Sequence, residues 1–209
     1  MTMSVTSPEA DPSTVLPEPV RSAPAIDTDR VADLIAQLLV ELGEDPARDG
    51  LRGTPGRVAA WWKAFLSADG AAVDTCFTES RLSGQLVVVG GMNVWSLCIE
   101  HHMLPMSLQV TAGYVPEGEV LGLSKFARIA QRFGGRLQVQ ERFTRQVFDY
   151  LTGVIGRGDV AVHVRGTHLC MSMRGVRMDA ALTTTLQAGG RFESDPVLSQ
   201  QFLTLTTAP

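Results

Sequence analysis

The sequence has few cysteines, no long apolar run and no large excess of charge. Its 209 residues include three cysteines, an odd number that argues against a disulfide framework and favours a reducing, cytoplasmic location. No run of about 18 apolar residues occurs, and no basic patch precedes an apolar segment at the N-terminus, so we expect neither a membrane span nor a signal peptide. The net charge of −4 predicts no general affinity for nucleic acid.

The apolar content of 44% is that of a globular protein with a real core. Residues 1–26 are rich in Pro, Ser, Thr and Ala, which predicts a disordered N-terminal arm. We expect residues 27–209 to form a single domain, because no second boundary interrupts them.

Two helices are predicted at the start of this domain, one from Asp27 or Thr28 to Gly43 and one from Thr54, as N-cap, to about Ser67. From residue 86 onward, short β-branched segments predict strands at 86–89, 94–97, 109–115, 160–165 and 182–187. Apolar periodicity predicts helices from Ser124, over 139–154 and over 196–205. The pattern indicates an α+β fold whose antiparallel strands carry paired helices on one side.

Potential metal ligands gather in two short segments, at Cys98, His101 and His102 and at His168 and Cys170. Thiolates and imidazoles are the ligands that zinc prefers, and a site with three of them leaves a position for an activated water. Period-two alternation predicts that His168 and Cys170 face the same side of a strand. A core role is the alternative, but neighbouring histidines rarely both pack in a core.

Basic residues cluster between Ser124 and Arg145, a segment that contains six basic residues and a single acidic one, Glu141. The helix predicted there has an apolar face, and Lys125, Arg128 and Arg132 fall on its opposite side. Such a local cluster in an acidic chain favours an anionic small molecule over DNA. A solvated helix face is the alternative.

Four motifs together resemble the GTP cyclohydrolase I family in order and spacing: residues 100–105 (EHHMLP), 122–125 (GLSK), 138–142 (QVQER) and 168–175 (HLCMSMRG). The resemblance spans about residues 28–205. It implies a T-fold subunit with an N-terminal helical extension, assembled into a toroidal homodecamer whose active sites lie between subunits. The implied enzyme is a hydrolase that takes GTP, or a related guanine nucleotide, through attack at C8 to formate and 7,8-dihydroneopterin triphosphate.

The resemblance also implies roles for single residues. Zinc would be held by Cys98, His102 and Cys170, and His101 and His168 would move protons. Guanine would be read by Glu141, whose carboxylate can accept from two adjacent N–H groups, with Gln138 in the same pocket; an ion pair of Glu141 with Arg145 is the alternative. The remaining expected contacts, to the triphosphate or ribose, involve Ser124, Lys125, Arg128, Arg174 and Arg57. Cys76 and His163 match no site position and are expected to be structural.

The chain departs from the family at the metal motif, where Ile99 separates Cys98 from Glu100. A bulge would absorb the extra residue; alternatively, Cys98 would swing away and leave His102 and Cys170 as a weak site. The departure raises the alternative of a specialised paralogue that opens the purine but releases a pyrimidine. A separate alternative is a non-catalytic oligomer that binds a guanine nucleotide or pterin.

Overall fold

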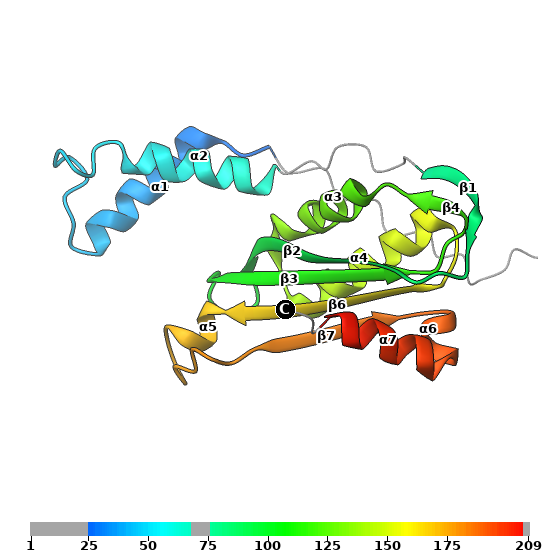
Figure 1. The fold of residues 1–209 in the computed structure, drawn as a ribbon. Helices are drawn as coiled ribbons and strands as arrows, with labels where there is room; N and C mark the ends of the chain where they lie inside the picture. The colour runs from blue at the N-terminus through cyan, green and yellow to red at the C-terminus, as the bar shows by residue number, and fades with distance from the viewer. Residues whose placement is uncertain (1–24, 68–75, 207–209) are drawn as a thin grey trace, which may run out of the picture.

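The computed structural model describes residues 25–67 and 76–206 and shows a mixed α+β architecture (Figure 1). Its main sheet has the order β5-β2-β3-β6-β7, and every neighbouring pair is antiparallel except β2 with β5. The strands are β2 Val87–Cys98, β3 Pro105–Tyr114, β5 Leu137–Gln138, β6 Val160–His168 and β7 Thr183–Ala188. A second, two-stranded sheet pairs β1 Cys76–Ser83 with β4 Glu117–Leu121.

Helices cover both faces of the main sheet. On one face lie α3 Leu123–Gly134 and α4 Gln140–Ile155, where Phe126 and Phe143 pack with alternate residues of β3 and β6 such as Val110 and Val162 in the main core. On the other face, α6 Arg191–Ser194 and α7 Pro196–Thr206 pack through Phe192 and Phe202 in a smaller core. Period-two alternation of the strands supplies both cores.

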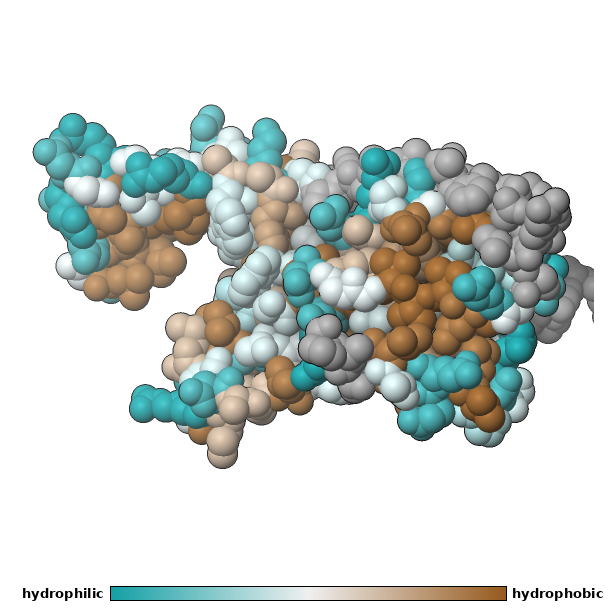
Figure 2. Space-filling model, in the orientation of Figure 1, coloured by the Kyte–Doolittle hydropathy of each residue, from teal (hydrophilic) through white to brown (hydrophobic). Residues whose placement is uncertain are grey.

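The first two helices form a hairpin. Helix α1 Thr28–Glu41 begins at Asp27, whose carboxylate accepts from the N–H groups of Asp29 and Arg30 and so satisfies two free donors of the first turn. Helix α2 Thr54–Leu66 lies beside it, and the hairpin projects from the rest of the chain (Figure 1). An apolar surface is exposed on α1 (Figure 2), where Leu34, Leu38 and Val40 are each more than half exposed.

The predicted elements from residue 27 onward are confirmed, with some corrections. The strands predicted at 86–89 and 94–97 are one strand, β2, whose pairing with β3 shifts between Val89 and Met92. Helix α2 has Gly53 as its N-cap, so Thr54, the predicted N-cap, is the first residue of the helix. Strands β1, β4 and β5 were not predicted from the sequence. The short β5 pairs through only two residues, which leaves almost no periodic signal.

The disordered N-terminal arm and the cytoplasmic location remain predictions. The arm was predicted over residues 1–26, and all but its last two positions lie outside the described residues. Within the described ranges, no helix combines the length and apolarity that a membrane crossing requires.

Candidate active site

The candidate site lies at one end of the main sheet. There β2 ends at Cys98, β6 ends at His168 and α4 begins at Gln140. The register joins these ends directly, because Cys98 lies opposite Gln138 of β5 and His168 lies opposite Met106 of β3. Segments distant in sequence therefore meet at this end of the sheet, where cysteine, histidine and acidic side chains are found.

Cys98 and Cys170 are brought together. The Cys98 side chain is buried, with 8% of its surface exposed. Burial raises the pKa of the Cys170 thiol, and the adjacent Cys98 sulfur raises it further through charge and hydrogen bonding. The predicted reason for the position of Cys170 is wrong: it lies in the helical turn α5 Leu169–Ser172, not on an alternating strand. The turn, and not the alternation of a strand, carries its sulfur to Cys98.

The loop 99–104 absorbs the extra residue Ile99. Its base is closed by a hydrogen bond from the Cys98 N–H to the Leu104 carbonyl, at 2.9 Å, and the Ile99 N–H donates to the Gln138 carbonyl at 3.1 Å. Within the loop, Met103 adopts a φ of 50°, which is uncommon for a residue with a side chain. Cys98 therefore stays at the end of β2, and the extra residue is accommodated in the loop that follows it.

His101 and His102 are exposed on this loop, with ring centroids 5.9 Å apart. Nη1 of Arg174 lies 2.7 Å from Nε2 of His102. A guanidinium can only donate, so this nitrogen of His102 accepts and carries no hydrogen. The pKa of His102 is lowered, chiefly by loss of solvation and further by the positive charges of Arg174 and His101.

The donor chemistry at this end of the sheet fits zinc, because two thiols are adjacent and imidazoles lie on the neighbouring loop. The geometry supplies two of the three predicted ligands. Among the described residues, no three His, Cys, Asp or Glu side chains lie close enough together to hold a metal ion. His102, the third predicted ligand, contacts Arg174 instead.

His168 and Glu141 lie near each other at the same end of the sheet as the thiol pair. Burial lowers the pKa of His168, while the negative charge of Glu141 acts in the opposite direction. Glu141 is exposed in the first turn of α4. The alternative partner predicted for it, Arg145, instead pairs with Asp149, where Nε and Oδ2 are 3.5 Å apart. The carboxylate is thus presented at the surface of the site.

Two glutamines of the QVQER motif are buried, and only one of them was a predicted site residue. Gln138, predicted to line the guanine pocket, accepts from Arg142 Nε at 2.6 Å and donates to Gln146 Oε1 at 2.8 Å. Gln140 was not among the predicted site residues. Its Oε1 lies 2.7 Å from Nε2 of His168. Its place next to Glu141 in the motif was the available signal.

The predicted phosphate-binding residues of α3 do not reach this end within one chain. Helix α3 begins after Leu121, whose N–H donates to the Tyr114 hydroxyl at the opposite end of β3. The helix then runs toward β5, so Ser124 and Cys98 are separated by most of its length, about 15 Å at 1.5 Å per residue. Lys125 is buried, with 8% of its surface exposed, so the alternative that it lies on a solvated helix face is wrong. Arg128 is exposed. Arg57 lies on α2 and donates to Thr54 Oγ1 at 2.8 Å.

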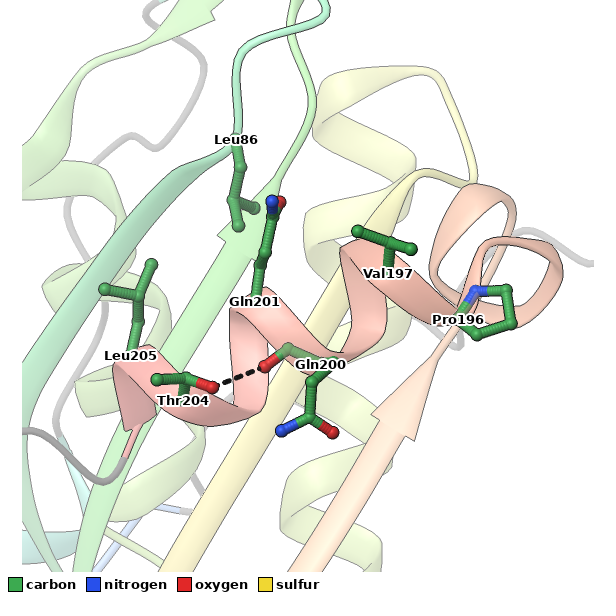
Figure 3. Close-up of a pocket in the computed structure, with 7 residues that line it drawn as sticks. All are labelled: Leu86, Pro196, Val197, Gln200, Gln201, Thr204 and Leu205. Carbon is green, nitrogen blue, oxygen red and sulfur yellow. Dashed lines mark hydrogen bonds between the residues drawn. The ribbon is translucent and has the colours of Figure 1, made fainter.

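A shallow groove of about 620 Å³ lies elsewhere, between α7 and the start of β2 (Figure 3). It is lined mainly by apolar groups such as Leu86, Val197 and Leu205. In the close-up, Thr204 turns its hydroxyl to the Gln200 carbonyl, so this polar group is satisfied within the helix. The groove contains none of the candidate catalytic groups.

Comparisons with known proteins agree with the motifs. The family model described as GTP cyclohydrolase I matches residues 31–207. Proteins named GTP cyclohydrolase 1 are similar over most of the chain: the one from Hyperthermus butylicus is 42% identical and covers 84% of this chain and 89% of its own length. The one from Deinococcus radiodurans is 39% identical, covering 93% and 92% respectively. The predicted family is confirmed: this chain belongs to the GTP cyclohydrolase I family.

Proposed function

We propose that this chain hydrolyses the imidazole ring of GTP at C8, releases formate and carries the product on to 7,8-dihydroneopterin triphosphate. The observation that carries the proposal is that one end of the sheet holds two interacting pairs, Cys98 with Cys170 and His168 with Glu141. Relatives named GTP cyclohydrolase 1, similar over more than four-fifths of the chain, support the substrate. The alternative end points, a released pyrimidine or binding without turnover, have no observation in their favour.

Zinc is the proposed cofactor, and Cys98, Cys170 and His102 would hold it after His102 leaves Arg174. When bound, it supplies an acidified water as nucleophile. Glu141 would accept hydrogen bonds from the two adjacent N–H groups of the guanine edge, a pairing that an adenine edge does not offer. His168 and His101 would transfer protons to and from the ring nitrogens and the ribose, since imidazoles exchange protons near neutral pH.

The triphosphate would be bound by Arg174, Lys125 and Arg128, with Arg57 and Ser124 as further contacts, because guanidinium forks and an ammonium suit dense negative charge. Since α3 starts at the far end of the chain's own sheet, we propose that a second copy supplies Ser124, Lys125 and Arg128. The exposed apolar surface of α1 and the α7 groove are suited to contacts between copies. The proposed assembly is the T-fold homodecamer that the family resemblance implies.

One incubation tests the proposal. Pure, zinc-replete protein is mixed with GTP, formate is quantified, and the other product is identified by mass and by fluorescence after oxidation. We expect one formate per GTP consumed and a fluorescent pterin. Formate without a pterin would instead indicate the truncated reaction, and unchanged GTP in protein with stoichiometric zinc would contradict the proposal.

A further inference from the structure

Gln140 is a buried polar side chain that the proposed reaction does not yet use. Only 1% of its surface is exposed, at the first position of α4, where the helix packs on β6 and β7. A buried amide is costly unless its donors and its acceptor are all bonded. All of them are bonded here, and one of the partners is His168.

The orientation of the Gln140 amide is fixed by its neighbours. Nε2 lies 3.1 Å from the backbone carbonyl oxygens of Val164 and Thr183, and 3.1 Å from Thr185 Oγ1. Backbone carbonyls only accept, so the NH₂ group must face them. A flipped amide would set its own oxygen against both carbonyls and leave the NH₂ without them. The amide oxygen therefore points to His168.

This orientation decides which nitrogen of His168 carries hydrogen. His168 Nε2 lies 2.7 Å from Gln140 Oε1, and an amide oxygen only accepts. Nε2 must then be the N–H, and in the neutral ring Nδ1 keeps the free lone pair. The partner that bonds one imidazole nitrogen sets the state of the other.

The packing around Gln140 leaves the amide little freedom. Gly166 lies two residues before His168 on the same face of β6, and a Cβ there would overlap Gln140 Oε1 and come within 2.9 Å of Leu108 Cδ2. The Thr144 hydroxyl donates to the backbone carbonyl of Gln140 at 2.8 Å and lies 2.6 Å from Thr185 Oγ1, which is itself a contact of the amide. Residues of α4, β6 and β7 thus all limit the movement of the Gln140 amide.

We infer that Gln140 is a positioning residue that holds His168 in the Nε2–H tautomer, so that Nδ1 is the nitrogen that takes up and returns the proton during turnover. The catalytic part of this inference rests on the proposed function of His168. The tautomer itself does not, because it follows from contacts within the chain.

The test reads the tautomer directly. Protein labelled with ¹⁵N-histidine is studied as purified by solid-state NMR, which any assembly size permits, at about pH 8, where imidazoles of ordinary pKa are neutral. The signal of His168 is assigned by its loss in His168→Asn. We expect an Nε2–H ring in the wild type and in Gln140→Glu, which keeps an acceptor, and a shift toward the Nδ1–H form in Gln140→Met, which has none.

Thr185→Val is the matched control, because it perturbs the same buried network but leaves the two carbonyls that orient the amide. We expect it to keep the wild-type tautomer even where it lowers the melting temperature. With GTP, Gln140→Met should lower kcat about 10- to 100-fold, less than the loss expected when the acid–base group itself is removed, with little change in KM.

Two outcomes would overturn the inference: an Nδ1–H ring in the wild type, or an unchanged tautomer in Gln140→Met. The wild-type spectrum alone decides the first, even if the methionine variant does not fold. Absence of formate release by the wild type would overturn the proposed function while leaving the tautomer result intact, so the two failures are distinguishable.

Discussion

The two histidine-bearing parts of the site are held in opposite ways. In the fixed half, His168 is bonded to Gln140, whose side chain is buried and bonded to two strands. In the loop half, residues 99–104, both His101 and His102 are exposed, and His102 contacts Arg174, itself an exposed side chain. Buried, fully bonded groups keep one geometry, whereas exposed side chains exchange partners readily. From this difference we expect His168 to keep one geometry during proton transfer, and the loop with His101 and His102 to rearrange when cofactor or substrate binds.

The two cysteines join these halves, so removing either should have the largest effect. We expect Cys98→Ala and Cys170→Ala each to lose bound zinc and all measurable formate release, because the remaining ligands are too few to retain the metal. Zinc is measured by elemental analysis of the purified protein. Cys76→Ala, at a cysteine expected to be structural, should keep both properties. Full zinc content in Cys98→Ala would remove that thiol from the ligand set.

The fixed half is tested by His168→Asn. If His168 transfers protons, kcat for formate release should fall by about 10²- to 10⁴-fold, while zinc content stays at the wild-type level. His163→Asn is the matched control, since it lies on the same strand but five residues earlier, and its kcat should stay near the wild-type value. An equal loss in both variants would point to strand packing in place of chemistry.

The loop half is tested by Arg174→Ala. Loss of a charged hydrogen bond to the triphosphate, about 1.5–3 kcal/mol, should raise KM for GTP roughly tenfold to a hundredfold with a smaller change in kcat. The exposed Arg177, three residues further along, provides the control Arg177→Ala. Steady-state kinetics with GTP measure both. A fall in kcat at unchanged KM would place Arg174 outside substrate binding.

The smallest expected effect concerns His163, which faces away from the site. Burial, followed by the charge of Arg165, lowers its pKa in the folded chain. The folded state thus binds this proton less well than the unfolded state, whose histidine pKa is about 6.5. Its contribution to stability is complete above that value and is lost as pH falls from there toward the folded pKa.

Urea unfolding at about pH 7.5 and about pH 5.5 measures this contribution at constant protein concentration. His163→Gln should lose less free energy of unfolding between the two pH values than the wild type does. Identical losses would show that other groups account for the acid sensitivity.

Much of the fold could be predicted from the sequence because the long elements carry strong periodic patterns. Phe126, Ile129 and Phe133 mark the buried face of α3, and all three are buried in the structure. Strands β1, β4 and β5 were missed, and β5 is defined by pairing with Cys98 and Leu97 rather than by its own pattern. Pairing between distant segments has no local signal in a single sequence.

The site was predictable as a set of residues but not as a geometry. The motifs named Cys170, His168 and Glu141, and the resemblance added Cys98 just before the first motif; the fold places all four at one sheet end. The sequence could not show that Gln140 supports His168, because a hydrogen bond across 28 positions depends on how α4 crosses β6. Nor could it show that the start of α3 lies at the opposite end of the chain's own sheet.

The most direct test of the central claim follows the carbon at C8. GTP labelled with ¹³C at C8 is incubated with zinc-replete protein and monitored by ¹³C NMR. The proposed reaction predicts that the label leaves the purine and appears as formate, one equivalent for each GTP consumed. A label that remains in the nucleotide, whether in intact GTP or in a retained formyl group, would contradict it.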